Sequence, residues 1–396
     1  MRTLVLLIAI AFTASGQRHK IEEVNSEKPE GKLLQQIMQE NDPAKKATLL
    51  EQFATQFPKE PGTPWALEQL QGIYVKANDP DKIIASGGQL LALDPDDPEA
   101  ALQCLKAAES KKDLALIKKY SAATSAAARK MASAPQPKDA DEAAAWKGDV
   151  DYAKQVDAYT EYSLYRVTLE SRDPKVTIEF AGLLRERDPK GDYAAKVVQP
   201  LFVAYRQAGD NAKAVALAEQ TLAAGQMNED MLLVVADSYV QQKKEPEKVH
   251  AYSAKIVELM GQKPKPEGVS DADWTARKNL VTGVAHYMNG KVYYNEANFG
   301  KADQALRAAL PLVDASLKTE EVHLATTQGT TTTIRRAAEP IMKAEVLYLL
   351  GFANYKLEKP QEAANYYRDC AALKSPYQAL AAKNLLGLKN QYHGIK

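Results

Sequence analysis

The sequence predicts an all-helical chain in which antiparallel helix pairs stack into a superhelical solenoid, interrupted by proline-rich elbows. Asp-Pro turns recur along the chain, and the apolar residues on either side of each turn follow the period of an α-helix. The alternation of apolar and polar residues that is typical of strands is missing. At 396 residues the chain also exceeds what one hydrophobic core usually serves, which favours several domains or an elongated repeat.

The Asp-Pro turns predict where helices begin. An aspartate side chain can accept a free amide of the first turn, and proline at the first helical position loses no hydrogen bond. The motifs are "NDP" at 41–43, "NDP" at 78–80, "RDP" at 172–174 and "GDN" at 209–211. The first two motifs are 37 residues apart and so are the last two, a period typical of helical-hairpin solenoids.

The N-terminal residues 1–16 have the layout of a secretory signal peptide. Arg2 precedes an apolar run from Leu4 to Phe12, which is too short to span a membrane, and small residues follow. We expect cleavage after Gly16, with an uncleaved anchor as the alternative. No cysteine lies near the cut, so we expect a periplasmic or secreted protein rather than a lipoprotein, without an integral membrane segment after cleavage.

Charge and cysteine content argue against several classes of protein. The chain has 51 basic and 51 acidic residues, and loss of residues 1–16 would leave 50 basic residues against 51 acidic ones. This balance does not favour nucleic acid or an anionic membrane as a partner. Cys104 and Cys370 are far apart on apolar helical stripes, so we interpret them as core residues, with a disulfide as the alternative.

Proline-rich segments divide the chain into three groups of helical hairpins. Each of two such segments leads to a tryptophan, Trp146 or Trp274, with a tyrosine nineteen residues later, so the following helices are expected to be longer than a standard hairpin arm. Coincidence in an alanine-rich chain is the alternative. The expected parts are a flexible segment at 17–30, hairpins at 31–133, a linker at 134–145, central repeats at 146–262, a linker at 263–272 and C-terminal repeats at 273–396.

Two segments carry a resemblance to a known family. The segment "AEVLYLLGFANYKLEKPQEAANYYRDCAAL", from Ala344, resembles a tetratricopeptide repeat, and residues 286–310 resemble it almost as well. Small residues at these positions allow two helix axes to approach closely. Weaker copies begin near Leu67, Leu164, Val198 and Leu232. The matching residues of the two strong copies are Leu347, Leu350, Gly351, Tyr355, Ala363, Tyr367 and Cys370, and Gly290, Tyr293, Ala302, Leu306 and Ala309.

The stretch "HLATTQGTTTTIRRAAEP" departs from the repeat pattern, because six threonines stand where the family would continue with the next helix. Threonine is β-branched and does not extend a helix well. We expect an exposed Thr-rich loop at 326–333 between two long helices, which is either a plain connector or a binding loop.

The sequence does not present a catalytic constellation. The five histidines are not within helical reach of one another, and metal-ligand pairs, phosphate loops and serine nucleophile elbows are missing. We therefore predict no enzymatic activity, no cofactor and no metal site.

The resemblance implies a binding surface instead, on the face of each first helix that is turned away from its second helix. Carried over to the two strong copies, the partner-binding residues would be Tyr287, Lys291, Tyr294, Asn295, Tyr348, Phe352, Tyr355 and Lys356. Packing of these tyrosines against the next repeat is the alternative.

The leading hypothesis is a non-enzymatic scaffold of the bacterial envelope that binds a peptide or helix of a partner protein in an aromatic-lined concave groove. One alternative is an accessory domain with a small-ligand pocket near the Thr-rich loop. Another is a structural protein that self-associates through its last helix.

Overall fold

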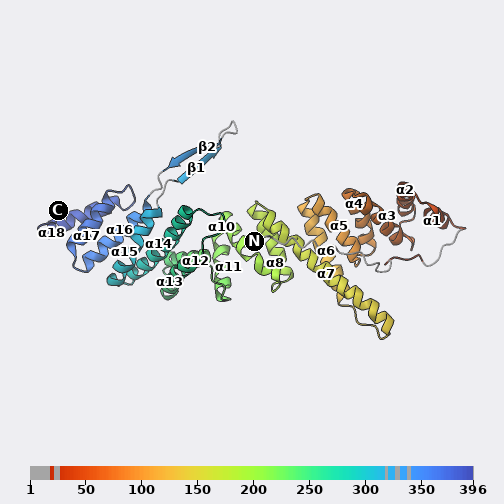
Figure 1. The fold of residues 1–396 in the computed structure, drawn as a ribbon, viewed down its shortest axis with the longest axis horizontal. Helices are drawn as coiled ribbons and strands as arrows, with labels where there is room; N and C mark the ends of the chain where they lie inside the picture. The colour runs from red at the N-terminus through yellow and green to blue at the C-terminus, as the bar shows by residue number, and fades with distance from the viewer. Residues whose placement is uncertain (1–17, 22–26, 317–319, 326–330, 337–339, 396) are drawn as a thin grey trace. The chain divides into compact units, whose positions relative to one another are not determined.

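The structure of the chain is a computed structural model that describes residues 18–21, 27–316, 320–325, 331–336 and 340–395 (Figure 1). The expected signal peptide lies outside the described residues, as do residues 17 and 22–26 of the segment expected to be flexible, and Pro29 and Glu30 of that segment are helical. The chain divides into two compact units, Met1–Ala208 and Gly209–Lys396, and each is described by itself.

Unit 1 consists of helices, each packed against the one before it. Helices two apart also touch, since α3 contacts α5 and α5 contacts α7. The helices are α1 (Pro29–Gln39), α2 (Pro43–Gln56), α3 (Thr63–Ala77), α4 (Pro80–Leu93), α5 (Pro98–Ser110), α6 (Leu114–Ala132), α7 (Ala140–Glu170), α8 (Pro174–Arg187), α9 (Asp192–Lys196) and α10 (Val198–Gln207).

Unit 2 repeats this arrangement, since α12 contacts α14 and α14 contacts α16 in addition to the contacts between successive helices. Its elements are α11 (Asn211–Ala223), α12 (Glu229–Gln242), α13 (Pro246–Gln262), α14 (Asp271–Asn295), α15 (Phe299–Ser316), β1 (Glu320–Ala325), β2 (Thr331–Arg336), α16 (Ile341–Lys356), α17 (Pro360–Ala371) and α18 (Gln378–Gln391). The predicted fold class is confirmed, because in both units the described helices pack against their neighbours in the chain and form a stack.

Aspartates begin the helices as predicted. Asp42 accepts hydrogen bonds from the backbone amides of Ala44 and Lys45, both at 2.9 Å. Each cap of this kind stabilises a helix by about 1 kcal/mol. Asp94 behaves differently, because it follows the end of α4 rather than preceding a helix. The other aspartates that cap a helix at an Asp-Pro or Gly-Asp turn are Asp79, Asp97, Asp173 and Asp210.

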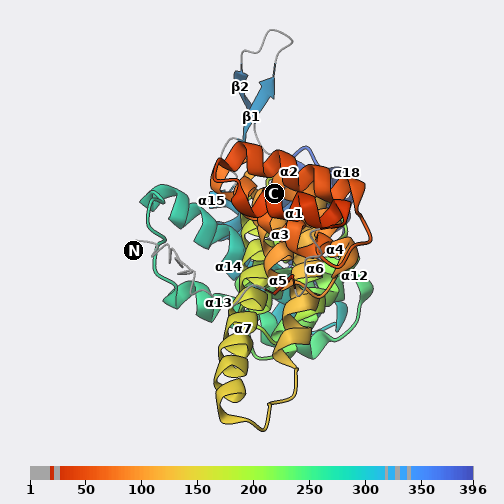
Figure 2. The same cartoon turned by 90° about the vertical axis from the view of Figure 1, so that its right-hand side faces the viewer.

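The helices that follow the proline-rich segments are the two longest in the described chain, with 31 residues in α7 and 25 in α14. Helix α7 extends beside α6 (Figure 2). It begins at Ala140, so residues 140–145 of the expected linker are helical. The reason is local, because Asp139 accepts hydrogen bonds from the amides of Asp141 and Glu142 and the alanines that follow favour a helix.

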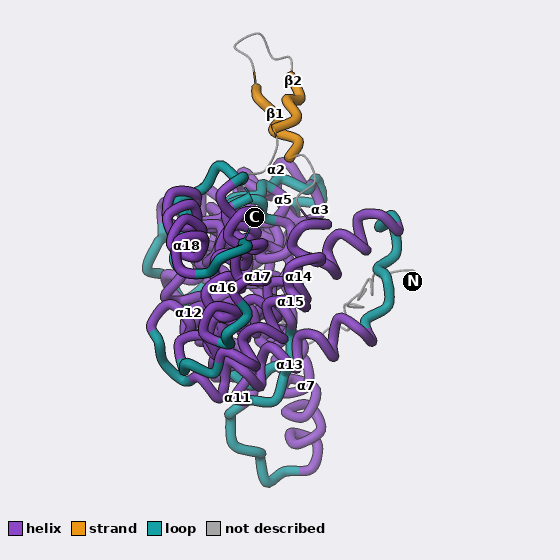
Figure 3. The backbone as a smooth tube through the Cα atoms, turned by 90° about the vertical axis from the view of Figure 1, so that its left-hand side faces the viewer, coloured by secondary structure: helices purple, strands orange, loops and turns teal. Residues whose placement is uncertain are grey.

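A short antiparallel hairpin connects α15 and α16, where the sequence suggested a loop. Strands β1 and β2 pair with Glu320 opposite Arg336 and Ala325 opposite Thr331. They are the strands of the described chain, and the rest of it is helix and loop (Figure 3). Residues 331–333 of the expected Thr-rich loop lie in β2, because β-branched threonines suit an extended backbone. Residues 326–330 lie outside the described residues.

The interior of each unit is apolar and closely packed. In unit 1, Leu50, Phe53 and Leu90 are fully buried. Cys104 and Cys370 are buried free cysteines, one in each unit. This agrees with the prediction that both are core residues. Within the described residues, no helix is both long and apolar enough to cross a bilayer.

Glycines allow helices to approach closely in the two strongest repeat copies. A Cβ at Gly351 would lie 2.7 Å from the ring of Tyr367, and one at Gly290 would lie 2.6 Å from Cγ of Leu306. Both distances are shorter than real carbon contacts. The second helix of each pair can therefore lie against the first only where the first has no side chain.

Candidate partner-binding surface

The expected binding residues of unit 2 lie on α14 and α16. In each helix the spacing of i, i+4 and i+7 puts three of them on one face. These are Tyr287, Lys291 and Tyr294 on α14, and Tyr348, Phe352 and Tyr355 on α16. Because α14 and α16 are in contact, the two faces can combine into one surface.

Aromatic rings join the two helices. The ring centroids of Tyr294 and Phe352 are 5.3 Å apart at an interplanar angle of 65°, and Phe299 is 6.0 Å from Tyr294 and 5.9 Å from Phe352. Tyr348 in turn lies 5.4 Å from Tyr377. We call these five half-buried side chains the aromatic row. Tilted and edge-on pairs of this kind contribute about 0.5–1.5 kcal/mol each beyond the burial of their area.

A polar group lies beside the aromatic row. The Nζ atom of Lys291 is 2.8 Å from Oε1 of Glu345 and donates a hydrogen bond of 2.9 Å to the hydroxyl of Tyr287. Burial raises the pKa of Tyr377 to about 12, and the charge of Glu345 adds to this effect. Burial and the same carboxylate also raise the pKa of Tyr287. Both phenols therefore stay protonated at neutral pH and can donate hydrogen bonds.

The structure distributes the eight expected residues over different environments. Tyr294, Tyr348 and Phe352 are half-buried and lie in the aromatic row, while Tyr287 is buried with 9 % of its surface exposed. Tyr355 packs on the C-terminal apolar cluster. Lys291 is held in the ion pair with Glu345. The last two residues are exposed at helix ends: Asn295 is the last residue of α14, and Lys356 ends α16 with Nζ 5.5 Å from the ring of Phe352.

Three residues of this surface were not expected from the sequence: Phe299, Glu345 and Tyr377. For Glu345 a signal was present, because it stands three residues before Tyr348 and seven before Phe352 and therefore shares their helical face. Phe299 is the first residue of α15, and Tyr377 directly precedes α18. Periodicity within α14 or α16 therefore does not predict their positions.

A separate cavity of about 350 Å³ lies on a different face of α14. It is broadly open to solvent, and Tyr293 on its wall stacks on His250 with centroids 4.0 Å apart. Burial lowers the pKa of His286, which lines the same cavity. The other lining residues are Asn289, Lys301, Gln304, Ala305 and Ala308. A cavity this open to solvent differs from the compact pocket near the Thr-rich loop that the small-ligand alternative predicts.

Comparison with known proteins gives limited additional information. The chain matches neither a protein-family model nor a curated protein. Among solved structures it is similar to the crystal structure of the TPR domain of P58(IPK), with a TM-score of 0.29 and 11 % identity over 93 % of this chain and 100 % of that one. It is also similar to yeast Tom70, with a TM-score of 0.24 and 11 % identity over 93 % of this chain and 97 % of that one. Because both scores are low, the fold assignment rests on the chain's own helix pairing.

Proposed function

We propose that the chain is a non-enzymatic protein–protein interaction scaffold of the bacterial envelope, and that the aromatic row of unit 2 binds a peptide or helix of a partner protein. The observation that carries this proposal is the contact between Tyr294 and Phe352, which links half-exposed rings of two neighbouring repeats. The signal-like N-terminal sequence supports an exported location, periplasmic or secreted.

The aromatic row suits recognition for physical reasons. Its rings are already held by one another and by the core, so binding a partner would cost little entropy for ordering these side chains. Aromatic side chains dominate the energetic centres of interfaces, where a truncation costs about 2 kcal/mol or more. The row would therefore provide several adjacent anchor points on a preformed surface.

The charges beside the row indicate what kind of partner would fit. The charge of Lys291 is balanced by Glu345, so the centre of the surface is close to neutral. Lys356 stands exposed at one end. We infer a partner segment that inserts apolar side chains along the row and contributes at most one or two acidic residues at its edge.

Two substitutions test the assignment. Tyr294→Ala combined with Phe352→Ala, both in the aromatic row, should abolish capture of partners from the native envelope and leave the helical circular dichroism signal unchanged. Tyr162→Ala is the matched control, because Tyr162 is an exposed tyrosine of α7 in the other unit. Equal capture by the double variant and by the control would reject the aromatic row as the binding surface.

Self-association is a second candidate, because α18 has exposed apolar side chains. Leu386 is 60 % exposed and Leu380 is 49 % exposed, whereas the outer face of a terminal repeat is usually polar. Light scattering of the purified chain and of Leu386→Glu tests this candidate. A dimer that the substitution converts to a monomer would support it, and a monomer in both would exclude it.

A further inference from the structure

The segment Arg18–Ile21 lies against the loop between α4 and α5, although 76 residues separate Arg18 from its partner in the sequence. Nε of Arg18 donates to Oδ2 of Asp94 at 2.7 Å, and Nη2 donates to Oδ1 at 3.2 Å. Two parallel bonds from one guanidinium to one carboxylate fix the orientation of the side chain as well as its position.

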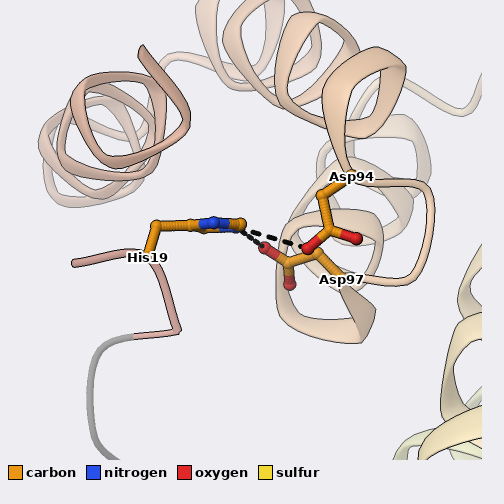
Figure 4. Close-up of side chains that lie close together, drawn as sticks. All are labelled: His19, Asp94 and Asp97. Carbon is orange, nitrogen blue, oxygen red and sulfur yellow. Dashed lines mark hydrogen bonds and ion pairs between the residues drawn. The ribbon is translucent and has the colours of Figure 1, made fainter. Parts of the chain in front are cut away.

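His19 binds the same loop at a more buried position. Its Nε2 is 3.3 Å from Oδ2 of Asp97 and 3.6 Å from Oδ2 of Asp94. Figure 4 shows the ring directed at both carboxylates. The side chain of Asp97 is only 4 % exposed and that of His19 13 %. A carboxylate oxygen so far removed from water is costly without a partner. Oδ1 of Asp97 accepts the amides of Glu99 and Ala100, and His19 is the partner of Oδ2.

Two further features complete the surface beneath this segment. Ile21 packs on the apolar cluster formed by α1 to α5. Glu68 on α3 has a buried Oε2 atom without a hydrogen-bond partner among the described residues. Burial raises the pKa of Glu68, and the nearby charge of His19 opposes this effect. The surface therefore combines three carboxyl groups with an apolar patch, and the segment supplies two basic side chains followed by an aliphatic one.

We propose that Asp94, Asp97 and Glu68, together with the apolar cluster beside them, form a binding site for an extended basic segment, and that Arg18–Ile21 is its resident ligand. A partner with the same chemistry, a basic pair followed two residues later by an aliphatic residue, must displace the segment in order to bind. The site is in unit 1 and does not depend on the aromatic row of unit 2.

The covalent connection explains why the chain's own segment would occupy the site. A tethered ligand acts at an effective concentration on the order of millimolar. A free peptide of equal intrinsic affinity therefore competes poorly until the tethered segment is weakened. This competition would make the site selective for partners that bind more strongly than Arg18 and His19 do.

The side chains of His19, Asp94 and Asp97 also resemble a metal site, because their ligand atoms lie within 4.8 Å of one another. The contacts of Arg18 argue against that interpretation. Its guanidinium already binds both oxygens of Asp94, including the one that faces His19, and a cation there would be repelled. Zn²⁺ added to the wild-type chain should therefore leave its melting temperature unchanged.

A labelled peptide of residues 18–24, RHKIEEV, provides the probe, with binding measured by fluorescence anisotropy. Arg18→Ala with His19→Ala should vacate the site and increase peptide affinity roughly tenfold or more over the wild-type chain. Adding Asp94→Asn and Asp97→Asn to that variant should remove the gain. Asparagine keeps the oxygen that accepts the amides of Glu99 and Ala100, so the start of α5 stays capped.

Lys20→Ala is the matched control on the segment itself, because Lys20 is exposed, and it should bind the peptide as the wild-type chain does. Equal peptide affinity of the wild-type chain and the variant Arg18→Ala with His19→Ala would overturn the proposal. Peptide affinity that stays high after Asp94→Asn and Asp97→Asn are added would overturn it as well. Stabilisation by Zn²⁺ would replace it with a metal site. Trypsin gives a second measurement: cleavage after Arg18 should be slower in the wild-type chain than in Asp94→Asn with Asp97→Asn, and equal rates would contradict docking.

Discussion

Gly351→Ala tests whether close approach of paired helices holds the repeats together. The new methyl group would lie 2.7 Å from Cδ1 and Cε1 of Tyr367 and 3.0 Å from its Cγ. Carbon atoms normally rest about 3.5–4.0 Å apart, so the methyl would overlap the ring by about 1 Å. Tyr367 is 2 % exposed, and its ring also contacts Tyr348 at 5.8 Å, so it has little room to move.

The expected magnitude is the difference between two effects. Overpacking of this kind costs about 1–3 kcal/mol, while alanine favours a helix interior over glycine by about 1 kcal/mol. Gly351→Ala should therefore lower the free energy of unfolding by up to about 2 kcal/mol. Gly387→Ala in α18 of the same unit is the matched control, because no atom beyond its chain neighbours and the backbone of its own helix lies within 4 Å of its Cβ position, and it should raise stability by about 0.5–1 kcal/mol.

Urea denaturation followed by circular dichroism measures both variants. The close-packing account predicts opposite signs for the two glycines. If Gly351→Ala stabilised the chain as much as Gly387→Ala does, α16 and α17 would not be as close as the structure places them, and the role of the small residue in this repeat would be wrong.

Three further predictions concern single residues. Cys104 and Cys370 should not react with a thiol reagent at pH 8 until denaturant is added, because burial raises their pKa values to about 12 and about 11; reaction in the native chain would contradict their burial. Asp173→Ala should cost about 1 kcal/mol of unfolding free energy in urea denaturation and Asp173→Asn much less, because Asp173 caps α8; equal losses would exclude the cap. Burial alone would raise the pKa of Glu229, but the hydrogen bond and charge of Lys263, a backbone amide and Arg277 together outweigh burial, and the pKa is lowered. This contribution to stability is therefore present above about pH 4.3 and is lost as the pH falls through the lower folded value. Melting curves from pH 7 to pH 3 should therefore fall less steeply for Glu229→Gln than for wild type, and parallel curves would contradict the shift.

The fold could be predicted because its signals are local. An aspartate before a first-turn residue determines where a helix begins, and this depends on atoms two or three residues away, as at Asp42 and Asp97. Apolar residues at helical spacing then determine which face of each helix is buried. Gly351 and Gly290 additionally indicated which helices approach closely, and the structure places bulky side chains against both.

The remaining features depend on contacts between distant parts of the chain. The sequence separation of His19 from Asp97 is 78 residues, so spacing within a helix could not have joined them. The polar contacts beside Tyr287 involve Lys291 and Glu345, and the latter lies on another helix. Residues 331–333 of the threonine-rich segment lie in a strand, but pairing between β1 and β2 requires a partner strand that alternation alone did not indicate.

Site-specific photo-crosslinking tests the central claim about the aromatic row most directly. A photoreactive phenylalanine analogue at position 348 would lie within the row, and the same analogue at position 162 would lie on α7 as the control. We predict that position 348 crosslinks a defined partner protein in the native envelope, that Tyr294→Ala weakens this crosslink, and that position 162 does not form it. Crosslinks of equal yield at both positions, or none at position 348, would contradict the account.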